Sequence, residues 1–428
     1  MYFRAATGLR GCPASCRVIK DVSFREQTGY TRQAGDLGLG SSVEERARAL
    51  ADEFRGRFGR EPEVVVRAPG RVELIGGHTD YNEGFVMPAA IDRDVLMAGA
   101  VAQGDTVRVW SVNFGEMSEI LLTDIRRVEE ASWSNYIRGV LDQFHRAGRV
   151  TPPMELVVEG NIPLGSGLSS SAALEVATAC LILKLTDGDM DGREMALLCQ
   201  RAENEFVGVN CGIMDQFISV LGQAGKTMFL DCRTLDHQFA NLPRGTRIVV
   251  ADSKKPRTLA GSEYNVRRAQ CEEAVSILRK HINGIRALRD VSVEDLERHG
   301  GKLPDVVRKR ARHVVHENER VLQALRALNA GDETEFGNLL NQSHASARDL
   351  YEISCDEMNW LQEAAVSVPG CLGSRLMGGG FGGCTVSVVR DEAVDEFRAV
   401  VSERYARQTG IEPEISVLNA SDGAGQVF

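Results

Sequence analysis

The chain has 428 residues, of which 43% are hydrophobic and 26% are charged, and its formal net charge is −10. This length predicts two or three domains with large cores, and the composition is ordinary for a soluble globular protein. Because 60 acidic residues outnumber 50 basic ones, the charge argues against general binding to nucleic acid or to an anionic membrane. Any anion must therefore be bound locally.

The ten cysteines are scattered along the chain, mostly inside apolar segments. Cys12 and Cys16 are nearest to each other, and no second pair accompanies them, so the spacing of a zinc site is missing. No apolar run approaches the roughly 18 residues that suggest a membrane span. We therefore expect reduced thiols in a cytoplasmic enzyme.

The first forty residues are basic at their start, since four Arg and Lys residues precede the first acid, Asp21. A transit peptide, a mis-assigned start and a disordered extension are all consistent with this composition. We predict that residues 1–40 are an extension, disordered and outside the folded domains.

The folded part is expected to begin at Ser42. Ser42 and Glu45 have the spacing of a capping box, and apolar residues recur at helical intervals from Val43 to Phe58. A short β-branched strand follows over residues 64–66. We expect it to end at the Ala-Pro-Gly sequence of residues 68–70.

Polar residues are dense directly after this strand. The group includes Arg71, Glu73, His78, Thr79 and Asp80. An ordinary loop can have this composition, but an Arg, a His and an Asp within ten residues of a strand end are typical of a site for a polar ligand. We interpret the group as a binding site.

The stretch from Gly160 to Ala173 has the features of a phosphate-binding loop. Gly165 and Gly167 permit positive φ and a close approach of the backbone to a bulky anion. The apolar residues that follow have helical spacing, so the loop opens onto a helix N-terminus, whose free N–H groups and dipole favour phosphate. The three serines 169–171 can donate to phosphate oxygens or ligate Mg²⁺. A Gly/Ser linker before a helix would look similar, and the other glycine segments favour the phosphate loop.

The rest of the chain alternates between strands and helices. Strands are expected at 107–112, 154–158, 228–230, 247–251, 384–389 and 414–418, and helices at 133–144, 195–206, 263–278, 306–328, 334–350 and 355–365. Helices outnumber strands in the C-terminal half, which predicts an α+β fold.

Two segments imitate known nucleotide motifs. Gly225-Lys226-Thr227 resembles the end of a P-loop, but Val220 stands where the first glycine is required, so we interpret the segment as a hairpin turn. Residues 378–383 satisfy the GxGxxG pattern, yet a strand follows where a dinucleotide site needs a helix. This context excludes a Rossmann site.

Two carboxylates farther along are candidates for the same cavity. Glu203 and Asp215 lie twelve residues apart, so neighbouring elements can bring them together. Spacing alone favours the other interpretation, in which each is a solvated carboxylate.

Several of these segments together resemble one family, the galactokinases of the GHMP small-molecule kinase superfamily. Residues 71–81 are similar to the galactokinase signature, residues 163–173 to the superfamily's phosphate loop, and residues 376–383 to its C-terminal glycine motif. Residues 212–216 and 261–268 also resemble galactokinase segments. The motifs follow the family's order and cover the chain from about Val64 to the last expected strand.

The resemblance implies a fold and a set of ligands. It implies an α+β protein with a ribosomal-S5-like N-terminal domain, over about residues 41–225, and a ferredoxin-like C-terminal domain, over about residues 226–428. ATP and a sugar would bind in the cleft between them, with Mg²⁺ as cofactor. Phosphoryl transfer depends on positioning and charge neutralisation, which a dipole-backed loop, Mg²⁺ and a cation supply.

The resemblance also implies roles for single residues. Asp215 would take the proton of the anomeric hydroxyl, Arg71 would stabilise nearby charge, and Ser171 and Glu203 would ligate Mg²⁺. The implied sugar-binding residues are Gly77, His78, Thr79, Asp80 and Tyr264. The implied ATP-binding residues are Gly165, Ser166, Gly167, Leu168, Ser169, Ser170 and Ser171.

The signature departs from the family's pattern at two positions. Galactokinases have Asn and Glu where this chain has Glu73 and Gly77. The family's Glu bonds the exocyclic hydroxyl of the sugar, so Gly77 is expected to leave space beside His78. The resembling plant galacturonokinases are also small here, which fits an anionic substrate that an acidic side chain would repel.

Three functions follow from the sequence. The first is ATP-dependent phosphorylation of the anomeric hydroxyl of galactose, giving α-D-galactose 1-phosphate. The second is the same reaction on galacturonate or another galactose variant altered at the exocyclic carbon. The third is a non-catalytic sensor of sugar and ATP, against which the retained Arg71, Asp215 and serines 169–171 argue. A small-molecule sugar is the expected partner, without nucleic acid or membrane.

Overall fold

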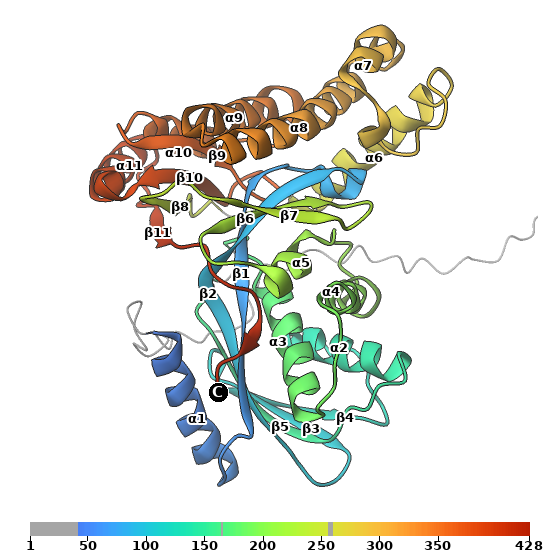
Figure 1. Ribbon diagram of the computed structural model, residues 1–428, viewed down its shortest axis with the longest axis vertical. Coiled ribbons are helices and arrows are strands. Elements are labelled where there is room, and N and C mark those ends of the chain that lie inside the picture. Colours follow the sequence, from blue (N-terminus) through green and yellow to red (C-terminus); the bar gives the residue numbers. More distant parts are fainter. Residues whose placement is uncertain (1–41, 164–165, 256–259) are drawn as a thin grey trace, which may run out of the picture.

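The computed structural model describes residues 42–163, 166–255 and 260–428. The extension predicted over residues 1–40, and Gly165 of the phosphate loop, lie outside these described residues. The described chain contains two β-sheets, and helices pack on both of them (Figure 1). The predicted α+β class is confirmed.

An eight-stranded sheet forms the N-terminal part. Its strands follow the order β12-β1-β2-β5-β3-β4, and β6 joins the sheet through β2 and carries β7. Every pair is antiparallel except β3 with β5. The strands are β1 (Val64–Ile75), β2 (Phe85–Val101), β3 (Thr106–Ser111), β4 (Glu116–Leu121), β5 (Met154–Gly160), β6 (Lys226–Asp231), β7 (His237–Asn241) and β12 (Gly425–Gln426).

Helices cover both faces of this sheet because its central strands are apolar on both sides. Val65 packs under α1, whereas Val64 and Val66, its neighbours, belong to the main core with α3. The capping box of Ser42 and Glu45 at the start of α1 is confirmed. The helices are α1 (Val43–Phe58), α2 (Asn135–Arg146), α3 (Ser170–Leu185), α4 (Gly192–Arg201) and α5 (Met214–Leu221).

A four-stranded antiparallel sheet, in the order β11-β8-β10-β9, forms the C-terminal part. Helices α10 and α11 pack on one face of it, and the other face joins the main core together with α9. Its strands are β8 (Thr246–Asp252), β9 (Cys371–Leu376), β10 (Cys384–Arg390) and β11 (Glu414–Leu418). Its helices are α6 (Ala260–Leu278), α7 (Val293–His299), α8 (Asp305–Ala330), α9 (Glu333–Ser346), α10 (Asp356–Val366) and α11 (Val394–Thr409).

Short helical turns complete the described chain. The 3₁₀ turns are Asp80–Asn82, Ser132–Ser134, Leu288–Asp290, Gly300–Lys302 and Asp391–Ala393, and the π-helical turns are Ala202–Val207 and Ala347–Tyr351. The π turns directly follow α4 and α9. Each of the predicted helices 195–206 and 334–350 is therefore an α-helix that ends in a π-helical turn. None of the described helices has the length and apolar character needed to cross a membrane.

The strand predicted over residues 64–66 is too short, and the prediction that it ends at residues 68–70 is wrong. β1 continues to Ile75, with a shift in register between Pro69 and Arg71 where it pairs with β2. A bulge lets a strand pass a proline, which cannot donate to the ladder. The long partner strand β2, absent from the predicted elements, keeps β1 extended. Arg71 and Glu73 are therefore strand residues rather than loop residues.

The turn at Gly225 is also different from the prediction. Gly225 has a positive φ of 71°, as a tight turn requires, but the turn joins α5 to β6 and not two strands. The hairpin interpretation is therefore wrong. The strand after residues 378–383 is present as β10, which supports the exclusion of a Rossmann site.

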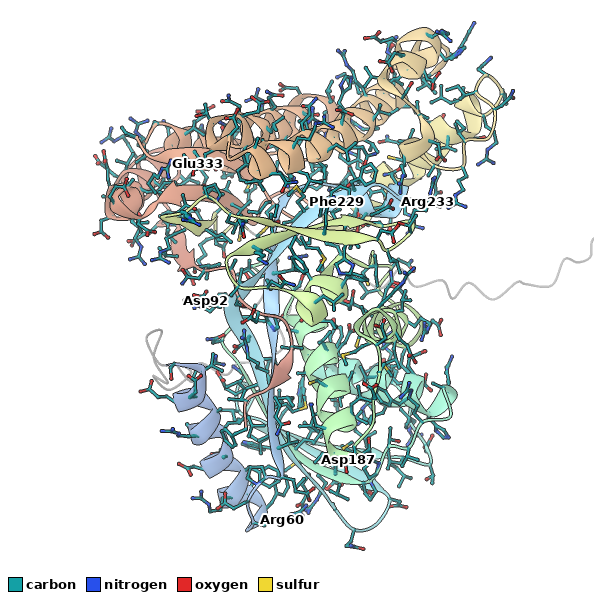
Figure 2. The ribbon with its side chains drawn as sticks, viewed as in Figure 1. Arg60, Asp92, Asp187, Phe229, Arg233 and Glu333 are labelled. Atoms are coloured by element: carbon teal, nitrogen blue, oxygen red, sulfur yellow. The ribbon has the colours of Figure 1, made fainter. Side chains whose placement is uncertain are left out.

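The two parts of the chain share one core. Phe229 of β6 lies on the side of the sheet that faces the C-terminal helices (Figure 2) and belongs to the same apolar cluster as Val321 and Leu325 of α8. β6 and β7 belong to the first sheet, so the second sheet begins only after Asn241. β12, near the C-terminus, returns to the first sheet. The domain boundary predicted near residue 225 stays a prediction.

Candidate active site

The predicted phosphate loop connects β5 to the N-terminus of α3. Gly167 has a φ of 76° and Ser169, at the N-cap of α3, has a φ of 61°. A serine in this left-handed region is strained, and such strain gathers at functional sites. Ser166 closes the turn by donating its hydroxyl to the carbonyl of Pro163. No side chain caps the N-terminus of α3 at Ser169, so its first N–H groups have no capping partner there.

Arg71 connects this loop to strand β1 through two hydrogen bonds. Its backbone N–H donates to the carbonyl of Leu168 at 3.0 Å, and its Nη1 donates to the carbonyl of Gly167 at 2.6 Å. Leu168 itself is buried in the core. The loop is therefore positioned by a strand residue that also bonds Asp215.

The two predicted catalytic residues, Arg71 and Asp215, form an ion pair, with Asp215 in the first turn of α5. Arg71 Nε and Nη2 donate to the two carboxylate oxygens of Asp215, each at 2.7 Å. Ser169 Oγ also donates to Asp215. A carboxylate has about four acceptor sites, so Asp215 still has acceptor capacity for a hydroxyl. The side chain is 24% exposed, which leaves it open to a substrate.

Glu203 is a second carboxylate near Asp215. Gln216 Nε2 donates to Glu203 at 2.7 Å and to Glu175 at 3.0 Å, and Cys211 Sγ donates to Glu203 at 3.3 Å. Burial, followed by the charge of Asp215, raises the pKa of Glu203 to about 7. The side chain of Ser171 is hydrogen-bonded to the same carboxylate. Glu203 and Asp215 therefore share one site, as one of the two interpretations of their spacing predicted.

An aromatic cluster contains two of the predicted sugar-binding residues, His78 and Tyr264. His78, with a φ of 63°, packs against the rings of Tyr81, Tyr264 and Tyr351. Its Nδ1 is 2.8 Å from the hydroxyl of Tyr81. Burial, then the charges of His313 and Arg375, lowers the pKa of His78 to about 3. The imidazole is thus neutral at physiological pH and can both donate and accept.

The carboxylate of Asp80 packs closely against Gly212. A Cβ at Gly212 would lie 2.1 Å from Oδ2 of Asp80, so a side chain there would displace the carboxylate. Burial, then the charge of Glu73, raises the pKa of Asp80 to about 7. The loop 208–213 and the 3₁₀ turn at 80–82 are therefore fitted to each other.

Thr79 uses its side chain within the turn. The side chain is fully buried, and its hydroxyl lies within hydrogen-bonding distance of the carbonyls of Gly76 and Phe85, at 2.7 and 2.6 Å. Its predicted role as a sugar-binding residue stays a prediction. Thr79 closes the turn that carries His78 and Asp80.

The expectation that Gly77 leaves empty space is wrong. A Cβ at Gly77 would lie 2.4 Å from Nη2 of Arg375, so the guanidinium group already fills this space. Arg375 is fully buried, and its Nη1 is 3.8 Å from Oε1 of Glu73. The N–H groups of Gly76 and Gly77 bond the carboxylate of Glu317. The two unusual signature positions thus surround one buried arginine.

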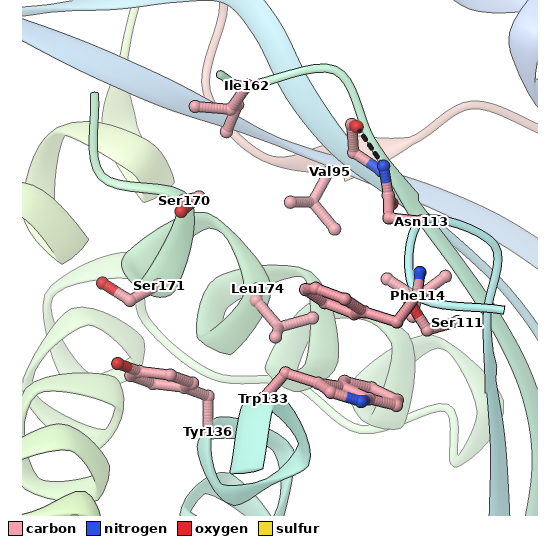
Figure 3. A pocket seen from close by; sticks show the side chains of 12 residues that line it. Val95, Ser111, Asn113, Phe114, Trp133, Tyr136, Ile162, Ser170, Ser171 and Leu174 are labelled. Atoms are coloured by element: carbon pink, nitrogen blue, oxygen red, sulfur yellow. Dashed lines mark hydrogen bonds between the residues drawn. The ribbon is translucent and has the colours of Figure 1, made fainter. Parts of the chain in front are cut away.

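A largely apolar cavity of about 290 Å³ adjoins the phosphate loop. Phe114 and Trp133, with nearly parallel rings 5.9 Å apart, line it together with Leu174 (Figure 3). Ser170 and Ser171 stand at its other end, at the start of α3. The cavity therefore leads from aromatic rings to the N–H groups that favour phosphate.

The sequence interpretation missed several of these residues. The aromatic lining of the cavity comes from a loop, the 3₁₀ turn at 132–134 and α2, which no motif marks. Arg375 directly precedes the glycine motif at 376–383, and Gly212 begins the segment 212–216. Gln216 joins the carboxylates of Glu203 and Glu175. It directly follows Asp215 in the sequence, so the segment 212–216 could have indicated it as a site residue. Among the described residues no cluster of three or more His, Cys, Asp or Glu could hold a metal ion by itself.

Known proteins share this sequence and this geometry. The model of the galactokinase galactose-binding signature matches residues 52–101, and the models of the GHMP kinase N-terminal and C-terminal domains match residues 135–223 and 324–407. A galactokinase from Roseiflexus is 48% identical over 379 residues, which are 89% of this chain and 97% of the relative. The chain belongs to the galactokinase family. A galactokinase from Chloroflexus aurantiacus, 46% identical, covers 88% of this chain and 96% of its own length.

Solved structures agree with this membership. The galactokinase of Lactococcus lactis, crystallised with galactose, has a TM-score of 0.84 at 35% identity and covers 88% of this chain and 99% of its own. A mevalonate kinase, with a TM-score of 0.58 at 16% identity, shares the fold alone. The predicted galactokinase family, with its two-part GHMP kinase fold and sugar kinase activity, is confirmed.

Replacing Asp80 with Asn should change how the stability of this galactokinase depends on pH. The folded protein raises the pKa of Asp80 from 3.8 to about 7, so folding favours its protonated form. The resulting stabilisation is complete below pH 4 and is lost as the pH rises to about 7. Relative to Asp80→Asn, the wild type should lose up to about 1.4 kcal/mol per pH unit between pH 5 and 7, and little more above.

Urea unfolding of both proteins without substrates, at pH 5, 6, 7 and 8, measures this difference. A difference in the free energy of unfolding that stays constant across the four pH values would contradict the assignment.

Proposed function

We propose that the protein transfers the γ-phosphoryl group of ATP to the anomeric hydroxyl of galactose and forms α-D-galactose 1-phosphate. The observation that carries this proposal is the bidentate pair of Arg71 and Asp215 beside the phosphate loop, in a chain of the galactokinase family. Arg71 contacts the phosphate loop, and the Asp215 carboxylate beside it is partly exposed. This arrangement suits two substrates that meet in line.

Each residue then has a defined part in the reaction. Asp215 accepts the proton of the anomeric hydroxyl as the oxygen attacks the γ-phosphorus, and Arg71 offsets the charge that develops there. The N-terminus of α3, with Ser169 and Ser170, holds the phosphates. His78, Asp80 and Tyr264 bind the sugar hydroxyls. ADP leaves with the electron pair of the broken phosphoanhydride bond.

Oxygen ligands for Mg²⁺ are available where the phosphate loop meets α3. Ser171 and Glu203 would hold it, because hydroxyl and carboxylate oxygens suit a hard cation that takes its remaining ligands from phosphates and water. When bound, Mg²⁺ would neutralise charge on the phosphates. Gln216 and Cys211, hydrogen-bonded to Glu203, orient the carboxylate for this task.

The adenine base would occupy the aromatic cavity. Its rings and aliphatic side chains offer the flat, apolar surface that a purine needs, and the serines of α3 stand at the end where the phosphates would begin. The ribose and the α-phosphate would therefore lie between the base and the phosphate loop.

Phe114→Ala tests the assignment of this cavity. Loss of one stacking face is expected to raise the KM for ATP about tenfold, which corresponds to about 1.4 kcal/mol, with little change in kcat or in the KM for galactose. Steady-state kinetics with each substrate varied in turn measures the effect. Phe58→Ala is the matched control, since Phe58 packs on Phe54 of α1 away from the cavity. An unchanged KM for ATP would contradict the assignment.

A coupled assay of ADP release, run over hexoses, amino sugars and uronic acids, tests the function itself. We expect turnover that requires both galactose and ATP. Binding of both without ADP release would favour the sensor function. Beside Gly77 lie both the guanidinium of Arg375 and the carboxylate of Glu73, so turnover of the uronic acids in this panel decides between galactose and the uronate alternative.

A further inference from the structure

Glu175 of α3 is a buried carboxyl group just beyond the phosphate-loop motif. It lies one helical turn after Ser171, so the two side chains share a face of α3. The side chain is fully buried, and Oε2 accepts a hydrogen bond from Gln216 Nε2 at 3.0 Å. The other oxygen, Oε1, is buried and has no partner among the described residues. A buried polar atom without a partner is costly, so this oxygen requires an explanation.

Gln216, in the first turn of α5, has a matching orphan atom. Its side chain is also fully buried. Its Nε2 carries two hydrogens and donates to Glu175 and to Glu203, at 3.0 and 2.7 Å. Its Oε1 has no partner within the described ranges. Two acceptor atoms thus remain alone, and they belong to two side chains that already bond each other.

The surroundings of Glu175 favour a neutral carboxyl group. An ionised carboxylate buried here would need a cation or several donors, and its described contacts supply a single amide N–H. Burial, then the charge of Glu203, raises the pKa of Glu175 well above its usual value. A neutral carboxyl group needs one acceptor for its O–H. Gln216 Oε1 is an acceptor on the amide that Glu175 already bonds.

We propose that Glu175 is a positioning residue for Glu203 and acts on it through Gln216. The neutral carboxyl group accepts a hydrogen bond from Gln216 Nε2 and donates one to Gln216 Oε1, so both orphan atoms gain a partner. The amide is thereby fixed with its second N–H on Glu203. This inference rests on the proposed function, because it takes Glu203 as a ligand of Mg²⁺.

The orientation of this amide decides what the Glu203 carboxylate faces. A half-turn of the amide would exchange its nitrogen and its oxygen, and the oxygen would then face and repel Glu203. Ser171 is hydrogen-bonded to Glu203 as well. Helix α3 therefore holds this carboxylate twice, directly through Ser171 and indirectly through Glu175 and Gln216. Loss of such an outer partner typically lowers metal affinity about 10- to 100-fold.

The test measures the affinity of Mn²⁺, as a probe of the Mg²⁺ site, for the protein with a nonhydrolysable ATP analogue. The electron paramagnetic resonance signal of free Mn²⁺ gives the dissociation constant. Glu175→Met keeps the approximate size of the side chain but cannot form the pair, and it should weaken Mn²⁺ binding about tenfold or more. Glu175→Gln can form both hydrogen bonds with Gln216, so its affinity should stay within about twofold of the wild-type value.

The neutral variant separates positioning from charge. If Glu175 instead supplied a negative charge to the metal site, Glu175→Gln would lose as much Mn²⁺ affinity as Glu175→Met, and this result overturns the inference. Thr178→Val is the matched control, because Thr178 is a buried polar residue of α3 that bonds the carbonyl of Leu174. Its Mn²⁺ affinity should be unchanged. An equal loss in Thr178→Val and Glu175→Met would indicate a general disturbance of α3 and would also overturn the inference.

Infrared spectroscopy tests the pair even if Glu175→Met does not fold. The difference spectrum between the wild type and Glu175→Gln at pH 7 should contain the C=O stretching band of a protonated carboxyl group. Absence of this band overturns the inference.

Failure of the proposed function has a separate signature. Glu203→Gln should itself weaken Mn²⁺ binding about tenfold or more, because it removes a charged ligand. If its affinity is unchanged, Glu203 does not bind the metal, and this part of the proposed function fails together with the inference. If Glu203→Gln weakens binding and Glu175→Met does not, the inference alone is overturned.

Discussion

Replacing Asp215 with Asn is expected to lower kcat for galactose by about two orders of magnitude or more, the range of a lost general base. Asparagine keeps the size of the side chain and one acceptor for Arg71, but it cannot take the proton of the anomeric hydroxyl. Nucleotide binding should be nearly intact, because the phosphates contact the loop and the helix N-terminus. Steady-state kinetics and calorimetric titration with a nonhydrolysable ATP analogue measure the two effects.

The chain offers a close control for this change. Asp290 accepts two hydrogen bonds from Arg233, at 2.6 and 2.9 Å, in an ion pair away from the reaction centre. Asp290→Asn removes the same charge from the same kind of pair and should leave kcat near the wild-type value. Wild-type turnover in Asp215→Asn would remove Asp215 from the mechanism, and an equal loss in both variants would point to a general structural effect.

The second large effect is expected from Gly167→Val, which should abolish nucleotide binding. Gly167 has a φ of 76°, a conformation that a β-branched residue rarely adopts. Its carbonyl accepts a hydrogen bond from Arg71, so a change in the backbone here also disturbs the reaction centre. A side chain would in addition occupy the space into which the phosphates must come. Titration with the nonhydrolysable ATP analogue is the measurement.

Gly410→Val separates strain from ligand contact. Gly410 ends α11 with a φ of 71°, and a Cβ there would meet nothing within 4 Å. Both variants pay a similar conformational cost, but only Gly167 lies at the loop. Nucleotide affinity should therefore survive in Gly410→Val. Unchanged affinity in Gly167→Val would mean that the phosphates bind elsewhere.

These predictions share one structural cause, the central place of Arg71. Through one side chain and one backbone N–H, Arg71 connects β1 with the phosphate loop and with Asp215 of α5. The three segments are separated by about 100 and about 50 residues in the sequence. A displacement of the loop would therefore change the position of Asp215, the proposed general base, relative to the loop.

The sequence alone determined the local parts of this galactokinase. The capping box at Ser42, the glycine-rich turn into α3 and the periodicity of the long helices depend on neighbouring residues, so a pattern along the chain predicts them. The motifs at residues 71–81 and 212–216 likewise indicated the family, because their chemistry requires particular residue types in order.

Only the tertiary structure decided what these residues contact. β1 continues through Pro69 because β2 pairs with it, and Thr79 is buried because the turn closes on two backbone carbonyls. The space at Gly77 is filled by Arg375, which lies about 300 residues away in the chain. The aromatic cavity is likewise formed by elements that meet only in the fold. Contacts of such long sequence separation depend on the packing of sheets and helices, which spacing along the chain does not encode.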